Sequence, residues 1–272
     1  MTPWAGKPDP VDPALRPAGW LRAVLRGPAL AAIVFGGLAL HMLVRAVEAP
    51  LHGSRRPWTA RITVAVCRAA LRVLGIARRS RGARDPAAGA QVANHSSWLD
   101  IFALNAEGPL YFVSKAEVAS WPGIGWLARA TGTVFIERRR SEAGRQRALL
   151  RERLALGHLL TVFPEGTSTD GRRVLPFKTT ILAAFAETPG LVVQPVTVLW
   201  HAPPGERADL HGWWGEMSFG AHALAMLAAP SGGTVEIVHH APVAVADLPD
   251  RKRLAPALRA AVAFGMPWDA GS

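Results

Sequence analysis

The feature that most limits the fold is an uncharged run of eighteen residues at positions 27–44, which Arg22 and Arg26 precede and Arg45 follows. His41 is its one polar interruption. A helix of this length is at the lower limit for crossing a bilayer. Five prolines within residues 1–19 predict a flexible tail, and this polar lead favours a retained anchor over a cleaved signal peptide. A spanning helix, a shallow helix in one leaflet and a buried core helix are the three open possibilities.

Positive charge is concentrated in the N-terminal third of the chain. Residues 1–84 carry fourteen Lys or Arg against three acids, whereas residues 85–272 carry seventeen of each sign. Basic residues interleaved with apolar ones favour an anionic membrane surface. Residues 58–79 predict a basic amphipathic helix, because four arginines fall on one line of it: Arg61, Arg68, Arg72 and Arg79. We therefore expect a membrane-anchoring segment at 1–84 and a catalytic domain at 85–272.

Helix and strand candidates alternate through residues 85–272. This pattern predicts an α/β fold with a mixed central sheet flanked by helices. Pro195 interrupts the apolar run 191–200, which predicts an edge strand or a bulged one. Cys67 is the single cysteine, so a disulfide framework and a cysteine-rich metal site are excluded.

The segment 92–101 predicts the end of a buried strand, a turn and the start of a helix, with His95 and Asp100 as a candidate catalytic pair. A histidine can take a proton near neutral pH, and a carboxylate on its second ring nitrogen orients it. On one regular helix the two residues would lie about 140° apart. They can meet if His95 lies in the turn and Asp100 in the first helical turn. Ser97 and Asp100 also fit a helix-capping pattern, which is compatible with catalysis.

A second candidate centre follows the apolar strand at 159–163. Glu165 stands between Pro164 and Gly166, directly after that strand, in a loop that continues to Gly171. The carboxyl ends of strands in an open α/β sheet are where ligand contacts gather. The arginines at 138–140, which follow another predicted strand, belong to the same expectation.

The order of these motifs resembles the glycerolipid acyltransferase family, best known from 1-acylglycerol-3-phosphate acyltransferases. The first motif resembles Asn94-His95 through Asp100, and the second resembles residues 115–138 with Gly132 and Phe135-Ile136-Glu137-Arg138. The third resembles Phe163-Pro164-Glu165-Gly166-Thr167, and the fourth resembles Val193-Gln194-Pro195-Val196. The resemblance covers about residues 90 to 200, and four motifs in order make it specific.

The resemblance implies that His95 is the general base that deprotonates an acceptor hydroxyl and that Asp100 orients it. The hydroxyl oxygen would attack a thioester of acyl carrier protein or coenzyme A, with no other cofactor and no metal. Arg138, Glu165, Gly166 and Thr167 would line the acceptor site, and Asn94 or a backbone N–H could stabilise the oxyanion. Family members work on lysolipids at membranes. We accordingly expect a bacterial-type inner membrane with the site on its cytoplasmic side.

One departure from the family bears on the acceptor. Many phosphate-acceptor members carry Arg directly after Phe-Pro-Glu-Gly-Thr, where this chain has Ser168. The run 163–171 more closely resembles lyso-ornithine lipid O-acyltransferases. Asp170 could pair with the ammonium of such an acceptor, and Arg172 or Arg173 could serve a phosphate. Lyso-ornithine lipid is the expected acceptor. A 1-acylglycerol-3-phosphate acyltransferase, or an enzyme with both activities, is the alternative.

Three other classes have less support from the sequence. A basic nucleic-acid-binding module rests on net charge alone, and no nucleic-acid partner is expected. A serine hydrolase would have to pair His95 with Ser168. Metal catalysis would need ligands that converge, whereas His239 and His240, adjacent on a predicted strand, would point to opposite faces.

Overall fold

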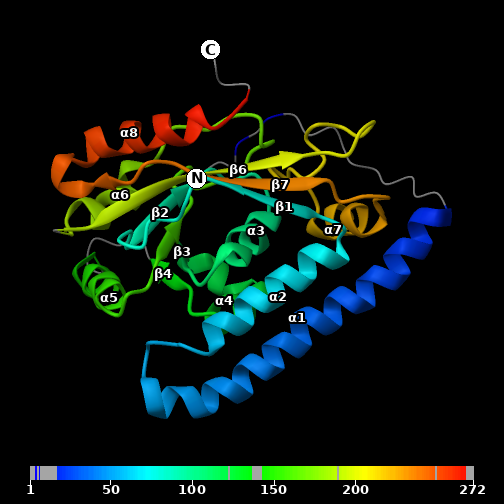
Figure 1. Ribbon diagram of the computed structural model, residues 1–272, viewed down its shortest axis with the longest axis horizontal. Coiled ribbons are helices and arrows are strands. Elements are labelled where there is room, and N and C mark those ends of the chain that lie inside the picture. The colour runs from blue at the N-terminus through cyan, green and yellow to red at the C-terminus, as the bar shows by residue number, and fades with distance from the viewer. Residues whose placement is uncertain are drawn as a thin grey trace.

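The computed structural model describes residues 4, 6, 17–121, 123–136, 143–188, 190–248 and 250–267. Within that part of the chain eight strands form one sheet in the order β1-β7-β6-β2-β5-β3-β4, with β8 also paired to β6 (Figure 1). The strands are β1 (Ala77–Arg81), β2 (Ala90–Ala93), β3 (Tyr111–Lys115), β4 (Val134–Ile136), β5 (Leu160–Val162), β6 (Val192–His201), β7 (Thr234–His239) and β8 (Val243–Ala244).

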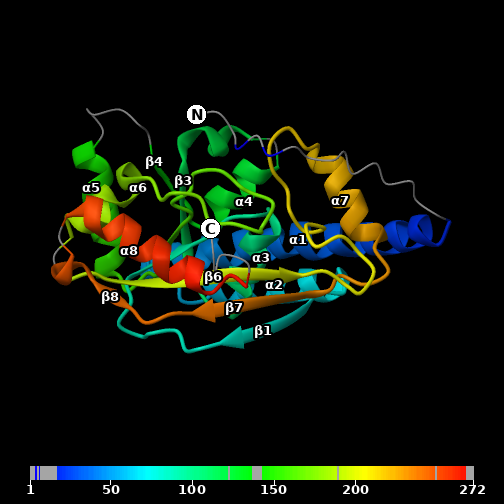
Figure 2. The same cartoon turned by 90° about the horizontal axis from the view of Figure 1, so that it is seen from above.

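The helices cover both faces of this sheet. They are α1 (Pro17–His52), α2 (Thr59–Val73), α3 (Leu99–Glu107), α4 (Ile124–Ala130), α5 (Ala143–Ala155), α6 (Thr179–Ala186), α7 (Phe219–Ala228) and α8 (Arg251–Phe264), with short 3-10 turns η1 (Ala116–Ser120) and η3 (Val245–Asp247). Seen from above, α8 and α6 lie nearest the viewer and α1 passes behind the sheet (Figure 2).

Two apolar cores hold the layers together. On one face, Leu150, Leu182 and Leu254 from α5, α6 and α8 pack on the sheet. On the other, Leu71 from α2 and Leu104 from α3 pack in a second cluster with residues of α7. Strands β2 and β5 are buried along their whole length, as expected for strands that helices cover on both faces. The mixed sheet flanked by helices confirms the predicted fold class.

Strand direction places the chemistry at one edge of the sheet. Strand β2 runs parallel to both β5 and β6, and β5 is parallel to β3. The carboxyl ends of these strands therefore meet at one edge. Strand β7 is antiparallel to β6 and parallel to β1, so β1 and β7 end at the opposite edge. The turn with His95 and the loop with Glu165 follow β2 and β5 and are neighbours.

The strand with Pro195 is central, so its predicted edge position is wrong. Strand β6 pairs with β2 on one side and with β7 and β8 on the other. Pro195 lies between the residues of β6 that pair with β7 and those that pair with β8. Val196 opposes His239 and Val193 opposes Val243, so the antiparallel register of β6 shifts by one residue between them. The missing N–H falls at this shift in register, where the extra residue belongs to the facing segment 240–242 and β6 itself keeps an unbroken register with β2.

The predicted helix at 58–79 is also too long. Helix α2 ends at Val73, because Gly75 adopts a φ of +70° and turns the chain into β1. Arg79 therefore lies on an edge strand instead of in line with Arg61 and Arg72. The expected boundary at 84/85 falls after β1, a strand of the central sheet, so residues 77–84 belong structurally with the domain that follows.

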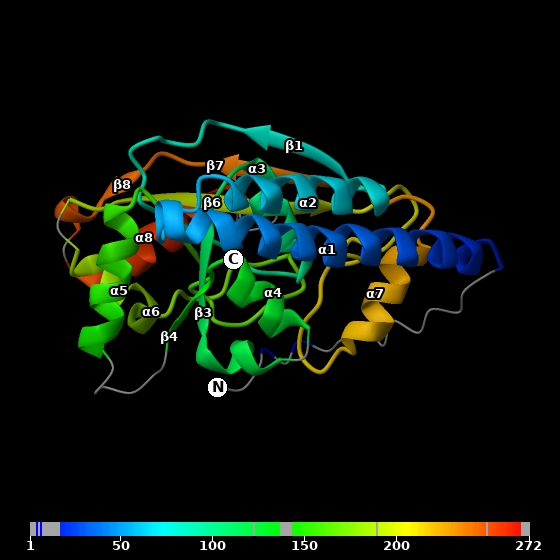
Figure 3. The same cartoon turned by 90° about the horizontal axis from the view of Figure 1, so that it is seen from below.

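Helix α1 is long and apolar enough to cross a membrane, and it lies along α2 with further contacts to α7 and α4 (Figures 1 and 3). It begins at Pro17, inside the segment predicted as a tail. Arg22 Nε donates to the Ala228 carbonyl over 2.7 Å, at the end of α7. Near the other end, the Glu48 carboxylate accepts the backbone N–H groups of Trp58 and Thr59. Both ends of α1 are thus fastened to the body.

Candidate active site

His95 and Asp100 meet in the turn between β2 and α3. His95 precedes the helix and Asp100 is its second residue, so the chain reverses enough to bring His95 Nδ1 within 2.8 Å of Asp100 Oδ2. The aspartate is fully buried, and the histidine side chain is 21% exposed. The sequence allowed this contact on condition that His95 lies in the turn and Asp100 in the first helical turn, and the structure meets that condition.

Backbone donors fix the Asp100 carboxylate. The N–H groups of Ser96 and Ser97 donate to Oδ2 over 2.7 and 3.0 Å. These hydrogen bonds offset the cost of burying the polar carboxyl group. In a helix-capping box, the acid three residues after the N-cap accepts the backbone N–H of the N-cap residue, and the bond from Ser97 N–H to Asp100 matches this. Asp100 therefore caps the helix and holds the histidine at once.

The imidazole is oriented on a second side by stacking. Its ring lies 4.1 Å from the ring of Phe163, centroid to centroid, at an interplanar angle of 14°. With Nδ1–H donated to Asp100, Nε2 carries the free lone pair, and no hydrogen bond to Nε2 is found among the described residues. An imidazole held in this way can accept a proton from a bound hydroxyl and return it to a leaving group.

The buried Glu165 carboxyl connects the His95 turn with the segment at Leu175. Its Oε1 accepts the His95 backbone N–H over 2.7 Å, and its Oε2 accepts the Leu175 backbone N–H over 2.8 Å. Burial raises the pKa of the Glu165 carboxyl to about 8, against the lowering effect of these two donors. The side chain is 1% exposed. Glu165 thus supports the His95 turn, while its predicted contact with the acceptor stays a prediction.

The rest of the loop after β5, residues 166–171, packs beside the His95 turn. Gly166 has a φ of +70°, which favours glycine, and its carbonyl accepts from Lys115 Nζ over 2.8 Å. Thr167 Oγ1 accepts a long bond, 3.5 Å, from the Trp4 backbone N–H. Thr169 N–H donates to the His95 carbonyl over 2.9 Å.

Asp170 already has a cationic neighbour. Its two oxygens accept from Arg173 Nε and Nη2 over 3.2 and 3.0 Å. The Arg173 side chain is 51% exposed and the Asp170 side chain is 11% exposed, so the pair meets solvent mainly through the guanidinium. Arg138, the remaining predicted site residue, lies outside the described residues.

Asn94 does not fit the oxyanion role that the sequence left open for it. Its side-chain amide donates to the Val198 carbonyl over 3.0 Å and its oxygen accepts the Val198 N–H over 2.8 Å. Both polar atoms therefore tie the turn to β6. The hydrogen bonds of His95 among the described residues involve Asp100, Glu165 and Thr169, and they give no support to a pair with Ser168.

Sequence reasoning missed Trp200, whose indole N–H reaches Asp100 Oδ1 over 2.7 Å. The residue is distant in sequence and had no motif to mark it. Phe163 was noted only as part of a motif, and its stacking on His95 was not anticipated.

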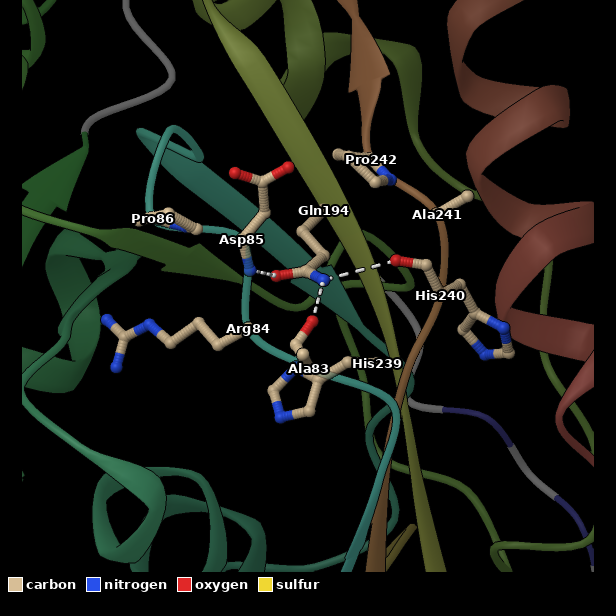
Figure 4. A pocket seen from close by; sticks show the side chains of 9 residues that line it. All are labelled: Ala83, Arg84, Asp85, Pro86, Gln194, His239, His240, Ala241 and Pro242. Atoms are coloured by element: carbon tan, nitrogen blue, oxygen red, sulfur yellow. Dashed lines mark hydrogen bonds between the residues drawn. The ribbon is translucent and has the colours of Figure 1, made fainter.

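A pocket of about 370 Å³ lies at the opposite edge of the sheet, between the segment after β1 and the segment after β7 (Figure 4). The Gln194 amide lines it, where it accepts from Asp85 N–H and donates to the Ala83 and His240 carbonyls. The amide joins three backbone segments, so this hollow is a structural junction remote from His95. Among the described residues no cluster of three or more His, Cys, Asp or Glu could hold a metal ion.

Comparison with known proteins defines the class. A family model described as Acyltransferase matches residues 83–199. The chain is 53% identical over 267 residues to a lyso-ornithine lipid O-acyltransferase of Rhodobacter capsulatus, covering 97% of this chain and 96% of the relative. The protein therefore belongs to the acyltransferase family and is an acyltransferase, as the resemblance implied.

Other relatives agree on the class and differ in their acceptors. A lyso-ornithine lipid O-acyltransferase of Brucella abortus is 36% identical over 60% of this chain and 66% of the relative. A 1-acyl-sn-glycerol-3-phosphate acyltransferase of Neisseria meningitidis is 38% identical over 42% of this chain and 45% of the relative. The crystal structure of the 1-acyl-sn-glycerophosphate acyltransferase PlsC of Thermotoga maritima matches the fold, with a TM-score of 0.65, 23% identity and coverage of 91% of this chain and 94% of that one.

Proposed function

We propose that this acyltransferase transfers a fatty acyl group from an acyl thioester to the hydroxyl of lyso-ornithine lipid. The observation that carries the proposal is the 53% identity to a lyso-ornithine lipid O-acyltransferase along nearly the whole length of both chains. The departure at Ser168, where phosphate-acceptor members carry arginine, supports the same acceptor.

In the proposed reaction His95 Nε2 takes the proton of the acceptor hydroxyl as its oxygen attacks the thioester carbonyl. An O–C bond forms and the C–S bond breaks. The imidazolium then returns the proton to the departing thiolate, so that an ester and a free thiol are the products. Asp100 stabilises the imidazolium through Nδ1 over 2.8 Å. We propose that acyl carrier protein or coenzyme A supplies the thioester and that no metal or further cofactor takes part.

The charged pair beside the turn, Asp170 with Arg173, is our proposed site for the acceptor headgroup. Asp170 directly follows Thr169, whose hydroxyl donates to the His95 carbonyl over 3.3 Å, so the carboxylate belongs to the loop that wraps the His95 turn. An ammonium can join the carboxylate beside Arg173, because that pair is partly open to solvent. Gly166 and Thr167 would form the wall between the headgroup and His95.

We further propose that the enzyme works on the cytoplasmic face of a bacterial inner membrane, with α1 lying in one leaflet. Helix α1 is fastened to α7 and α2 at its two ends, and its outward side chains are large and apolar: Leu21, Leu25, Phe35, Leu43, Val47 and Leu51 are all more than half exposed. A helix held flat against the body favours shallow insertion over spanning.

Aromatic side chains connect this surface with the site. Trp98, three residues after His95, packs edge-on against Phe219 of α7, with ring centroids 5.4 Å apart. Phe219 is 43% exposed and α7 contacts α1. A lipid acceptor could therefore leave the bilayer beside α7 and approach His95 along an apolar surface.

A second candidate acceptor is 1-acylglycerol-3-phosphate, because the relatives from Neisseria and the matching fold from Thermotoga maritima carry that name. Arg172 and Arg173 are the cations that could meet its phosphate. The two acceptors make opposite demands on charge near Asp170, so one assay can separate them.

The decisive experiment offers the purified enzyme both lysolipids with both donors, acyl carrier protein and coenzyme A thioesters. We expect kcat/KM for lyso-ornithine lipid to exceed that for lysophosphatidate. Efficient acylation of lysophosphatidate with no reaction of lyso-ornithine lipid would overturn the proposed acceptor while leaving the enzyme class intact.

A further inference from the structure

We propose that Trp200 is a positioning residue for acyl transfer: its indole N–H holds one oxygen of Asp100 so that the other stays directed at His95. The inference rests on the proposed role of His95 as the general base. It concerns how the base is oriented, whichever lysolipid is the acceptor.

The two oxygens of Asp100 have separate partners. Oδ2 faces the turn and meets His95 Nδ1 at 2.8 Å together with the two backbone N–H groups of Ser96 and Ser97. Oδ1 faces the sheet and accepts the Trp200 indole N–H over 2.7 Å, with the Ser96 hydroxyl farther away at 3.4 Å. Without the indole donor, Oδ1 would keep only the long contact to the Ser96 hydroxyl, and the plane of the carboxylate could tilt about its Cβ–Cγ bond away from His95 Nδ1. The indole N–H makes the observed orientation the favoured one.

Trp200 is itself held rigidly. It is the penultimate residue of β6, paired with Val235 of β7, and is 8% exposed in the core shared with α3. Its ring stacks on the buried His211, with centroids 4.8 Å apart and an interplanar angle of 23°. His211 Nε2 is 2.7 Å from the Gly232 carbonyl, and burial lowers the pKa of this histidine, so a neutral ring lies against the indole. Sheet, indole and carboxylate thus form one fixed unit.

Other tryptophans near the site direct their N–H groups at different partners. Trp98 donates to His222 Nδ1 over 3.0 Å, and Trp213 donates to the Met217 carbonyl over 2.9 Å. The first bond joins the start of α3 to α7, and the second lies within the loop before α7. The bond from Trp200 ends on the charged group that contacts His95, which is why we assign it to positioning.

Loss of this donor has two expected effects. A charge-assisted bond to a buried carboxylate is removed, so kcat/KM falls roughly tenfold. More negative charge is left on Asp100 to favour the protonated imidazole, so the acid limb of the pH profile of kcat/KM moves to higher pH. Within the described part of the chain, the other ionisable groups in contact with this unit are Glu165, through the His95 backbone, and His211, through the indole ring. Neither is altered by a substitution at position 200.

The experiment compares the wild type with Trp200→Phe, each bound to vesicles of phosphatidylethanolamine and phosphatidylglycerol. The acceptor is the lysolipid that the wild type uses best, so failure of the acceptor proposal does not affect the result. Trp213→Phe is the matched control, because it makes the same side-chain change and removes an indole bond to a backbone carbonyl. We expect the acid limb to move for Trp200→Phe and to stay in place for Trp213→Phe.

A double-mutant cycle separates positioning from packing. In an Asp100→Asn background, Trp200→Phe should lower kcat/KM by less than twofold. The carboxylate that the indole orients is already absent in that background. If Trp200→Phe does not fold, β-(3-benzothienyl)alanine at position 200 keeps the shape of the ring and removes the N–H alone. An unchanged acid limb, or a full tenfold loss in the Asp100→Asn background, would overturn the inference.

Discussion

The turn after β2 and the loop after β5 each bury a carboxylate at the same edge of the sheet, yet the two acids have different partners. Asp100 accepts, besides the Ser96 and Ser97 backbone N–H groups, from a side chain, His95, that can exchange a proton with a substrate. Glu165 accepts from two backbone N–H groups that cannot. Both are at most 1% exposed. Burial alone therefore does not identify a catalytic acid, and the nature of the partner does.

The hydrogen-bond partners of Asp100 and Glu165 also show that both carboxylates act on His95. Glu165 holds the backbone of His95, and Asp100 holds its ring, so one acid places the residue and the other orients its imidazole. Substitutions at the two carboxylates should consequently fail in different ways. Asp100 variants should lose rate beyond any loss of stability that follows from releasing the Ser96 and Ser97 N–H groups, whereas Glu165 variants should act through stability alone.

The largest effect is expected for His95→Ala. Removal of the general base should lower kcat/KM for the lysolipid by about 10⁴-fold while thermal unfolding changes little, since the side chain is partly exposed. Initial rates with radiolabelled acyl thioester on vesicle-bound enzyme measure this loss. Retention of more than a tenth of the wild-type rate would remove His95 from the chemistry.

Asp100→Asn should follow, with kcat lowered by about 10²-fold, because an amide can offer the imidazole an N–H where an acceptor is needed and so stabilises the wrong tautomer. The KM for acceptor should stay within about twofold, since Asp100 touches no substrate. Steady-state kinetics separate the two parameters. A rise in KM at constant kcat would assign Asp100 to binding instead.

Glu165→Gln should lower the free energy of unfolding by about 1–3 kcal/mol, because the amide NH₂ would face a backbone N–H and leave that donor without an acceptor. The pH dependence has a definite sign. The folded pKa of about 8 exceeds the ordinary 4.5, so the native state retains a proton that the unfolded chain releases. The stabilising contribution is complete below about pH 4.5 and is lost as pH rises to about 8.

The measurement is Tm against pH for the wild type and Glu165→Gln. The wild type should lose stability between about pH 5 and 8 relative to the variant, whose residue 165 does not titrate. Parallel curves would show that folding leaves the pKa of Glu165 unchanged.

The smallest effect is expected for Asp170→Asn. Loss of a partly exposed charge should reduce kcat/KM for lyso-ornithine lipid about fivefold and leave lysophosphatidate unchanged or improved. The ratio of the two rates is the quantity to compare, because it cancels differences in folding and vesicle binding. Equal loss with both acceptors would place Asp170 in the support of the loop.

How far the sequence predicted this site depends on separation along the chain. The contact between His95 and Asp100 is local, so the turn and the helix start were enough to show that the two side chains could meet. The bond from Trp200 to Asp100 spans 100 positions and depends on β6 lying beside β2, which no local pattern reveals. The same holds for the central place of Pro195, whose missing N–H suggested an edge.

Some of the differences had signals in the sequence. Gly75 interrupts the arginine pattern four residues before Arg79, and a glycine near a helix end commonly stops it. The role of Glu165 was anticipated only in part: its position after a buried strand marked it as important, but a motif does not reveal two backbone partners from separate segments.

The measurement that most directly tests this account is a double-mutant cycle on His95 and Asp100, with Glu165 as the comparison. If Asp100 acts through the imidazole, His95→Ala/Asp100→Asn should be no slower than His95→Ala alone. Glu165→Gln, measured per folded molecule in the same His95→Ala background, should leave the same residual rate. A further loss of about 10²-fold when Asp100→Asn is added to His95→Ala would contradict the account, because the carboxylate would then act without the ring it is held to orient.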